Sequence, residues 1–166
     1  MYWYVMRHGD ALPASGVSAG DDQRALSPSG RAELERCLQG MKLLGIELDA
    51  VVTSPLARAR ESAVIIAEGL GVRLVESPTL RPAVPTEELL ASLEPYREQR
   101  VLLVGHQPDL GLLVCRLVWG QAAGEISFRK GAMCCLNVTW GIGQSPAALE
   151  WFLTPDQLGR IGPKPK

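Results

Sequence analysis

Short apolar runs alternate with longer amphipathic segments along most of the chain. Runs of four or five apolar residues that end at turn residues are typical of buried strands, and they predict strands at 2–6, 50–53, 72–75 and 101–104. Apolar residues at helical spacing predict helices at 28–44, 56–70, 86–93 and 108–119. Ser27 and Thr86 are suited to cap two of these helices, and Gly45 and Gly71 to end two of them.

The pattern changes after residue 119. Strand-like segments at 126–128, 132–140 and 148–152 follow one another without a long helix between them. Strands in this arrangement favour antiparallel pairing at one edge of a sheet. The chain is therefore expected to form one three-layer α/β domain over residues 1–160, with a mostly parallel sheet and antiparallel edge strands. Residues 161–166, rich in Pro and Lys, are expected to be a disordered tail.

The composition is typical of a soluble globular protein, with 46% hydrophobic and 21% charged residues. A net charge of −1 argues against nucleic acid as a partner. No apolar run approaches the roughly 20 residues that span a bilayer, and the first residues do not form a signal peptide, so a cytoplasmic protein without membrane contact is expected. The cysteines lack metal-binding spacing and are expected to be buried thiols: Cys37, Cys115, Cys134 and Cys135.

Candidate chemistry follows three of the predicted parallel strands. Arg7 and His8 follow the first strand, Arg58 follows the second in the first turn of a helix, and His106 follows the fourth. The carboxyl ends of parallel strands meet at one edge of a sheet, so these side chains are expected to converge. Two arginines, two histidines and a helix N-terminus suit a dianion, and phosphate is the natural candidate.

Three motifs, in this order, resemble those of the histidine phosphatase superfamily, which includes cofactor-dependent phosphoglycerate mutases. They are Arg-His-Gly at 7–9, Ser-Pro-Leu-Ala-Arg-Ala at 54–59 and Gly-His at 105–106. The segments at 7–11 and 24–27 resemble most the small SixA-type phosphohistidine phosphatases. The resemblance runs from residue 1 to about residue 119, and it implies a phosphoglycerate mutase-like fold.

The resemblance also implies roles for five residues. His8 would be the nucleophile and would form a phosphohistidine intermediate on the enzyme. Arg7, Arg58 and His106 would bind and polarise the phosphoryl group, and Arg24 is a fourth candidate for phosphate binding. Neither a metal nor a cofactor is implied.

Two positions depart from the family pattern. Glu61 and Ser62 stand where the family usually has Gln-Thr, which makes the hydrogen bonding of that helical turn uncertain. Pro82 stands where mutases and many phosphomonoesterases have a glutamate that acts as general acid, as it does in SixA-type members. Such an acid contributes about 10²–10⁴-fold when an alkoxide leaves. Imidazole, whose conjugate acid has a pKa of ~6.5, leaves with little help, so the site suits phosphohistidine.

The expected function is a metal-independent phosphatase that acts on phosphohistidine in a partner protein. Only residues 76–100 separate the third and fourth strands, which is too short for a cap, so the site is expected to be open to a protein surface. The loop at 11–26 is long, and whether it closes over substrate is left open.

Other functions remain open from the sequence. A phosphomonoesterase for small metabolites would use Glu87 or Glu88 as its acid. A metallohydrolase would hold its metal with His8, His106 and Asp10, although the neighbouring arginines would repel a cation. Asp10 could instead orient a histidine or cap the loop. A phospho-recognition module would bind the same group without turnover.

Overall fold

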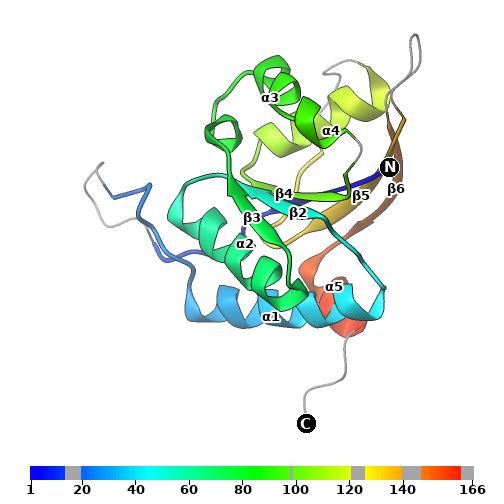
Figure 1. The fold of residues 1–166 in the computed structure, drawn as a ribbon. Helices are drawn as coiled ribbons and strands as arrows, with labels where there is room; N and C mark the ends of the chain where they lie inside the picture. Colours follow the sequence, from blue (N-terminus) through cyan, green and yellow to red (C-terminus); the bar gives the residue numbers. More distant parts are fainter. Residues whose placement is uncertain (14–19, 98, 121–125, 140–146, 162–166) are drawn as a thin grey trace.

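The computed structural model describes residues 1–13, 20–97, 99–120, 126–139 and 147–161. Figure 1 shows one sheet with helices on both faces, as the sequence predicts. The strands are β1 (Tyr2–Arg7), β2 (Ala50–Thr53), β3 (Arg73–Glu76), β4 (Val101–Gly105), β5 (Met133–Val138) and β6 (Ala147–Leu153). The helices are α1 (Pro28–Leu43), α2 (Ala57–Leu70), α3 (Thr86–Ser92), α4 (Asp109–Trp119) and α5 (Pro155–Ile161), with 3₁₀ turns at Pro78–Leu80 and Glu94–Tyr96.

The sheet has the strand order β3-β2-β4-β1-β5-β6. The first four strands are mutually parallel, because β4 pairs in parallel with both β1 and β2, and β2 pairs in parallel with β3. β5 runs antiparallel to both β1 and β6 and so extends the sheet at one edge. The mostly parallel sheet with an antiparallel edge is therefore confirmed.

Both faces of the sheet are buried, which explains why its central strands are continuous apolar runs. Trp3 and Val5 of β1 point to the face covered by α3 and α4. Tyr4 and Met6 point to the opposite face, covered by α1, α2 and α5. Figure 1 shows these two helical layers on opposite sides of the sheet. The alternation places the end of β1 between two packed cores, so the residues that follow it have a rigid support.

The predicted helix ends are largely confirmed. The Ser27 hydroxyl accepts a hydrogen bond from the Gly30 N–H and caps α1, with Pro28 in the first turn. Gly45 and Gly71 adopt positive φ just beyond α1 and α2, the conformation that favours glycine. Thr86 is different, because α3 begins at Thr86 itself and has no side-chain cap.

Two predictions about the C-terminal part are wrong. Residues 126–128 form no strand; the carbonyl groups of Ile126 and Phe128 accept hydrogen bonds from the side chains of Gln107 and Arg7 instead of pairing with a neighbouring strand. The segment after β6 contains α5, a helix that the sequence pattern did not predict. Residue 140 and residues 162–166, which belong to the predicted strand and tail, lie outside the described residues.

The four cysteines are free and buried, as predicted. Within the described ranges, no helix is long and apolar enough to cross a membrane.

Candidate active site

Three strand ends meet at one edge of the sheet, because β2, β4 and β1 are neighbours and run in the same direction. The side chains that follow these strands line a pocket of about 310 Å³. All five predicted site residues lie in it. The lining consists of Arg7, His8, Asp21, Arg24, Arg58, Pro82, His106, Gln107 and Lys130.

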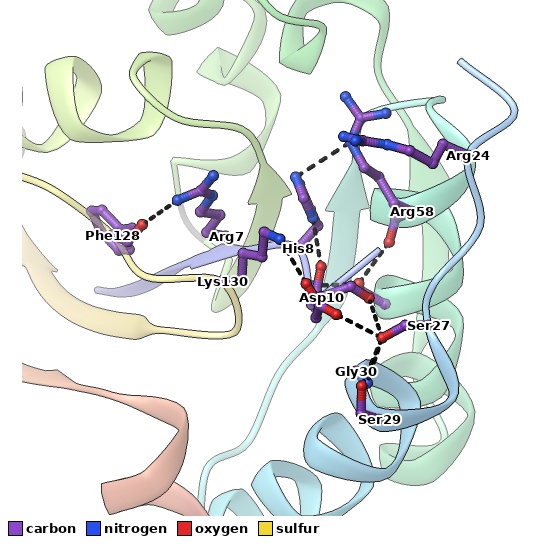
Figure 2. Close-up of polar contacts among 12 residues, drawn as sticks. Arg7, His8, Asp10, Arg24, Ser27, Ser29, Gly30, Arg58, Phe128 and Lys130 are labelled. Carbon is purple, nitrogen blue, oxygen red and sulfur yellow. Dashed lines mark hydrogen bonds and ion pairs between the residues drawn. The ribbon is translucent and has the colours of Figure 1, made fainter. Parts of the chain in front are cut away.

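His8 lies directly after β1 and is only 4% exposed. Its Nδ1 is 2.7 Å from the carbonyl oxygen of Gly9. A carbonyl oxygen can only accept, so Nδ1 carries the hydrogen and Nε2 carries the lone pair. Consistent with this tautomer, Nε2 accepts a hydrogen bond from Arg58 Nε at 3.3 Å (Figure 2). The chain thus presents a nitrogen lone pair to the pocket.

The environment of His8 keeps the ring uncharged. Its pKa falls from 6.5 to about 4, chiefly because of burial, with the nearby positive charges of Arg58 and Arg7 acting in the same direction and the Gly9 hydrogen bond opposing them. A neutral imidazole needs no prior loss of a proton before it attacks an electrophile. His8 is therefore in a nucleophilic form at neutral pH.

Arg58 is buried in the first turn of α2, with 4% of its surface exposed. Its Nη1 donates to the carbonyl oxygen of Asp21 at 2.8 Å, and its Nη2 pairs with the Asp21 carboxylate at 3.2 Å. Burial lowers its pKa from the usual 12.5. Arg60 lies on another face of the same helix, exposed and paired with Glu76, as the helical phase predicts.

Arg7 lies on the other side of His8 from Arg58 (Figure 2). Its Nη1 donates to the carbonyl oxygen of Phe128 at 2.7 Å, which fixes the guanidinium at the pocket wall. Its Nε is buried and has no hydrogen-bond partner among the described residues. A buried donor without an acceptor is unfavourable, and an anion in the pocket would supply that acceptor.

His106 follows β4 and is 3% exposed. Its Nε2 lies 2.8 Å from the hydroxyl oxygen of Ser54, and its ring centroid lies 5.1 Å from that of His8. The pKa of His106 falls from 6.5 to about 3, chiefly because of burial and also because of the nearby His8, Arg58 and Arg7. Its Nδ1 has no hydrogen-bond partner in the described part of the chain. Like Arg7 Nε, this atom is a buried polar atom without a described partner on a residue that lines the pocket.

Arg24 lines the pocket, as expected, with its Nε 3.4 Å from the Asp21 carboxylate. The sequence analysis missed Lys130, Gln107 and Asp21, which line the same pocket. Lys130 pairs with Asp10 at 2.6 Å. Lys130 and Asp21 belong to no motif, so only their placement in three dimensions identifies them.

Ser62 also supports the site without having been singled out for a role. Its hydroxyl accepts from the Gly9 N–H at 3.0 Å and donates to the Arg58 carbonyl at 2.7 Å. It thereby ties the loop after β1 to α2 and sets the spacing between His8 and Arg58. Glu61 accepts from the Leu26 N–H. The departure at positions 61 and 62 therefore leaves these hydrogen bonds in place.

Three acidic side chains that the sequence left open as candidates lie outside the pocket lining, although the Asp10 carboxylate accepts hydrogen bonds from Ala11 and Ser27 and so caps its loop. Glu87 is 71% exposed and pairs with Arg116, and Glu88 is also exposed; neither lines the pocket. Asp10 accepts from Ser27 and Lys130 and orients no histidine. Among the described residues, no group of three or more metal-ligating side chains is present.

The arrangement can bind a dianion next to a nucleophile. Four cationic side chains and one carboxylate line the pocket: Arg7, Arg24, Arg58 and Lys130, against Asp21. Preorganised donors of this kind stabilise a phosphoryl group during transfer, and the lone pair of His8 Nε2 lies among them. Phosphoryl transfer is the chemistry that these groups support.

Comparison with known proteins agrees with this chemistry. The model of the histidine phosphatase superfamily (branch 1) matches residues 3–83. An uncharacterised protein of Picosynechococcus sp. is 32% identical over 141 residues, which cover 82% of this chain and 85% of that protein. The phosphohistidine phosphatase SixA of Escherichia coli is 28% identical over 126 residues, covering 73% of this chain and 76% of SixA.

Solved structures share the fold. The protein histidine phosphatase SixA in complex with tungstate matches with a TM-score of 0.82 and 24% identity, over 95% of this chain and 99% of that one. An alpha-ribazole phosphatase from Shigella flexneri matches with a TM-score of 0.69 and 16% identity, over 93% and 97%. The fold, the family model and the pocket agree, and the chain belongs to the histidine phosphatase superfamily.

Proposed function

We propose that the protein is a metal-independent phosphatase that hydrolyses phosphohistidine on a partner protein. In the first step His8 Nε2 attacks the phosphorus, an N–P bond forms to His8, and the N–P bond to the substrate breaks. The substrate imidazole leaves and takes a proton from water. In the second step water attacks the phosphorus, and the bond to His8 breaks to release inorganic phosphate.

The charged groups of the pocket have distinct roles in both steps. Arg58 contacts His8 Nε2 in the free enzyme, so its guanidinium lies next to the attacking atom. Arg7 Nε and His106 Nδ1 are buried polar atoms without hydrogen-bond partners among the described residues, and phosphoryl oxygens would supply those partners. Lys130 and Arg24 add positive charge at the mouth. Together they offset the charge that the phosphoryl group carries through the transition state.

The composition of the pocket lining supports phosphohistidine as the substrate. Pro82, which has no proton to give, lines the pocket, and Asp21 is the carboxylate among the described lining residues. Asp21 is engaged in ion pairs with Arg58 and Arg24 and acts there as a counterion. No described carboxylate of the lining is free to protonate a leaving group, which suits one that departs unassisted, as imidazole does.

The segment between β3 and β4 favours a large substrate. It is filled by two 3₁₀ turns and α3, whose buried Leu80, Leu89 and Leu93 pack on the core below the sheet edge. Among the described residues of this segment, only Pro82 is part of the pocket lining. The described residues therefore leave the mouth of the pocket accessible to a histidine on a protein surface.

A phosphomonoesterase for small metabolites is the alternative function. It is favoured by the carboxylate of Asp21 in the pocket and by the shared fold of the alpha-ribazole phosphatase. In that case Asp21 would have to leave its arginine partners and protonate an alkoxide. Glu87 pairs with Arg116, and neither Glu87 nor Glu88 is part of the lining.

Incubation with a phosphohistidine-bearing protein tests the proposal. We expect loss of the substrate label, transient gain of one phosphoryl group on His8 by mass spectrometry under alkaline quench, and unchanged turnover after exhaustive chelation. His8→Ala should be inactive but folded by circular dichroism. Label on another residue, or faster turnover of a panel of sugar and nucleotide phosphates, would favour the alternative.

A further inference from the structure

A buried serine follows β2 and contacts the second histidine of the pocket. Ser54 is fully buried, and its Oγ lies 2.8 Å from His106 Nε2. The same oxygen accepts a hydrogen bond from the Leu56 N–H at 3.3 Å, at the entry to α2. Ser54 therefore connects the start of α2 with the ring of His106.

Hydrogen counting decides which atom donates between Ser54 and His106. A serine hydroxyl has one hydrogen to donate, and the Leu56 N–H is itself a donor, so it cannot take that hydrogen. Among the described residues, His106 Nε2 is the acceptor within reach of the Ser54 hydroxyl. The Ser54 O–H therefore points to His106 Nε2, which must carry a lone pair.

A lone pair on Nε2 places the ring hydrogen of neutral His106 on Nδ1. That atom is buried and has no partner in the described structure, and the residue lines the phosphate pocket. In the opposite tautomer, Nδ1 would present a lone pair to a bound dianion and would repel it. The Ser54 O–H would also lose its acceptor.

We propose that Ser54 is a positioning residue that holds His106 as the Nδ1–H tautomer, so that an uncharged His106 donates a hydrogen bond to a phosphoryl oxygen. The proposal rests on the proposed function only for the identity of the ligand. The tautomer itself is a property of the free protein.

The two histidines then share one tautomer but present different ring nitrogens to the pocket. The Nδ1–H of His8 is held by the Gly9 carbonyl, which leaves the Nε2 lone pair to attack. The Nε2 of His106 is held by Ser54, which leaves Nδ1–H to donate. The low pKa of His106, about 3, agrees with a donor that works without a positive charge.

Nitrogen NMR of protein labelled with ¹⁵N-histidine tests the proposal directly. The chain contains two histidines, so the His8→Ala variant assigns both ring systems. At pH 8 we expect a protonated Nδ1 and an unprotonated Nε2 for His106. Added inorganic phosphate should shift the Nδ1–H proton of His106. A protonated Nε2 in the free protein, or a Nδ1–H that does not respond to saturating phosphate, would overturn the proposal.

Substitutions separate the positioning role from a structural one. Ser54→Ala should shift His106 toward the Nε2–H tautomer and weaken inorganic phosphate binding about tenfold, the effect of one lost charge-assisted hydrogen bond. Ser54→Thr keeps a hydroxyl and should restore the Nδ1–H tautomer. Thr53→Val is the matched control, because it removes a buried hydroxyl that donates to the Ser54 carbonyl, and it should leave the tautomer unchanged.

The outcomes distinguish this proposal from the proposed function. If Ser54→Ala leaves the His106 tautomer unchanged, Ser54 does not position the ring, whatever the activity of the protein. If the tautomers and phosphate shifts are as expected but phosphohistidine proteins are not turned over, the proposed substrate is wrong and the role of Ser54 is kept.

Discussion

His8 and His106 are buried in a pocket whose other charges are mostly positive. Burial and the neighbouring guanidinium groups disfavour a further positive charge, and both pKa values fall well below 6.5. The two rings are therefore neutral in the folded protein across the neutral range. In the unfolded chain each would titrate at its ordinary value.

This difference makes stability depend on pH. Below pH ~6.5 the unfolded chain binds protons at both histidines and the folded protein does not, so the free energy of unfolding decreases as pH falls toward the folded values of about 4 and 3. We expect a loss of ~2–4 kcal/mol between pH 6.5 and 5, measured by urea denaturation. The variant with both His8→Asn and His106→Asn should show a shallower slope. Equal slopes in both proteins would mean that other groups control the dependence.

Arg58 can be separated from its neighbour Arg60 by mutation. Arg58 contacts His8, the proposed nucleophile, whereas Arg60 is exposed and paired with Glu76. Arg58→Ala should lower kcat/KM by at least ~10²-fold, the usual loss for one preorganised donor. Arg58→Lys should recover little, because an ammonium group cannot bridge two oxygens. Arg60→Ala should be nearly silent in the same assay, and similar losses at both positions would contradict the geometry.

The sequence predicted those pocket residues that directly follow a strand or open a helix. Arg7, His8, Arg58 and His106 could be placed because parallel strands bring their carboxyl ends to one edge. Lys130 could not, because it reaches the pocket through an irregular segment before β5. The partner of a buried side chain, such as Ser54 for His106, depends on packing distances that spacing along the chain does not encode.

Close packing of α1 against α5 holds the C-terminal end of the domain. Gly40 of α1 lies against the backbone of Leu158, and a Cβ built on Gly40 would come within 2.0 Å of the Leu158 carbonyl oxygen. Leu158 is fully buried in the core beneath the sheet. The approach of the two helices therefore requires glycine at position 40.

Gly40→Ala should push α5 away from α1 and lower the free energy of unfolding by about 2 kcal/mol, in the range of overpacked sites. Gly159→Ala, on the other helix of the same contact, is the control. A Cβ there would meet only the Cβ of Arg36 at 3.4 Å, and alanine favours a helix over glycine. Gly159→Ala should leave stability equal or raise it by up to ~1 kcal/mol. Equal destabilisation of both variants in urea would show that the contact is not as close as described.

The sequence predicted strands and helices correctly where the hydrophobic pattern alone determines them. β1, β2 and β4 are buried on both faces and stand out as apolar runs between turn residues. The segment at 126–128 has similar apolar content but uses its Phe128 carbonyl for Arg7. α5 spans Pro155–Ile161, and such a short helix depends on tertiary contacts with α1 more than on its own pattern.

The chain has a net charge of −1, yet its pocket is strongly cationic. Positive groups are gathered at one sheet edge, while acidic residues balance them elsewhere on the surface, as Glu47 and Asp49 do around Arg100. The pocket therefore provides phosphate with electrostatic stabilisation but provides a leaving group with little acid catalysis. The rates for different substrates should reveal this imbalance.

Turnover should depend steeply on the leaving group. Phosphohistidine and activated aryl phosphates should be hydrolysed, whereas phosphoserine and sugar phosphates should react slowly, because the described pocket offers no free carboxylic acid to protonate a departing alkoxide. We expect log kcat/KM to fall steeply as the pKa of the leaving group rises. The Glu87→Gln/Glu88→Gln variant is the matched control for acid groups outside the pocket, and its phosphohistidine rate should be unchanged.

Asp21→Asn decides between the two candidate functions in this series. Asp21 is a counterion of Arg58 and Arg24, so its neutralisation should leave the slope of the plot as steep as before and should not reduce the alkyl phosphate rates selectively. A flat plot in the unmodified protein that becomes steep in Asp21→Asn would identify Asp21 as a general acid. The metabolite phosphomonoesterase would then replace the phosphohistidine phosphatase, because a pocket that protonates alkoxides has no need of imidazole as its leaving group.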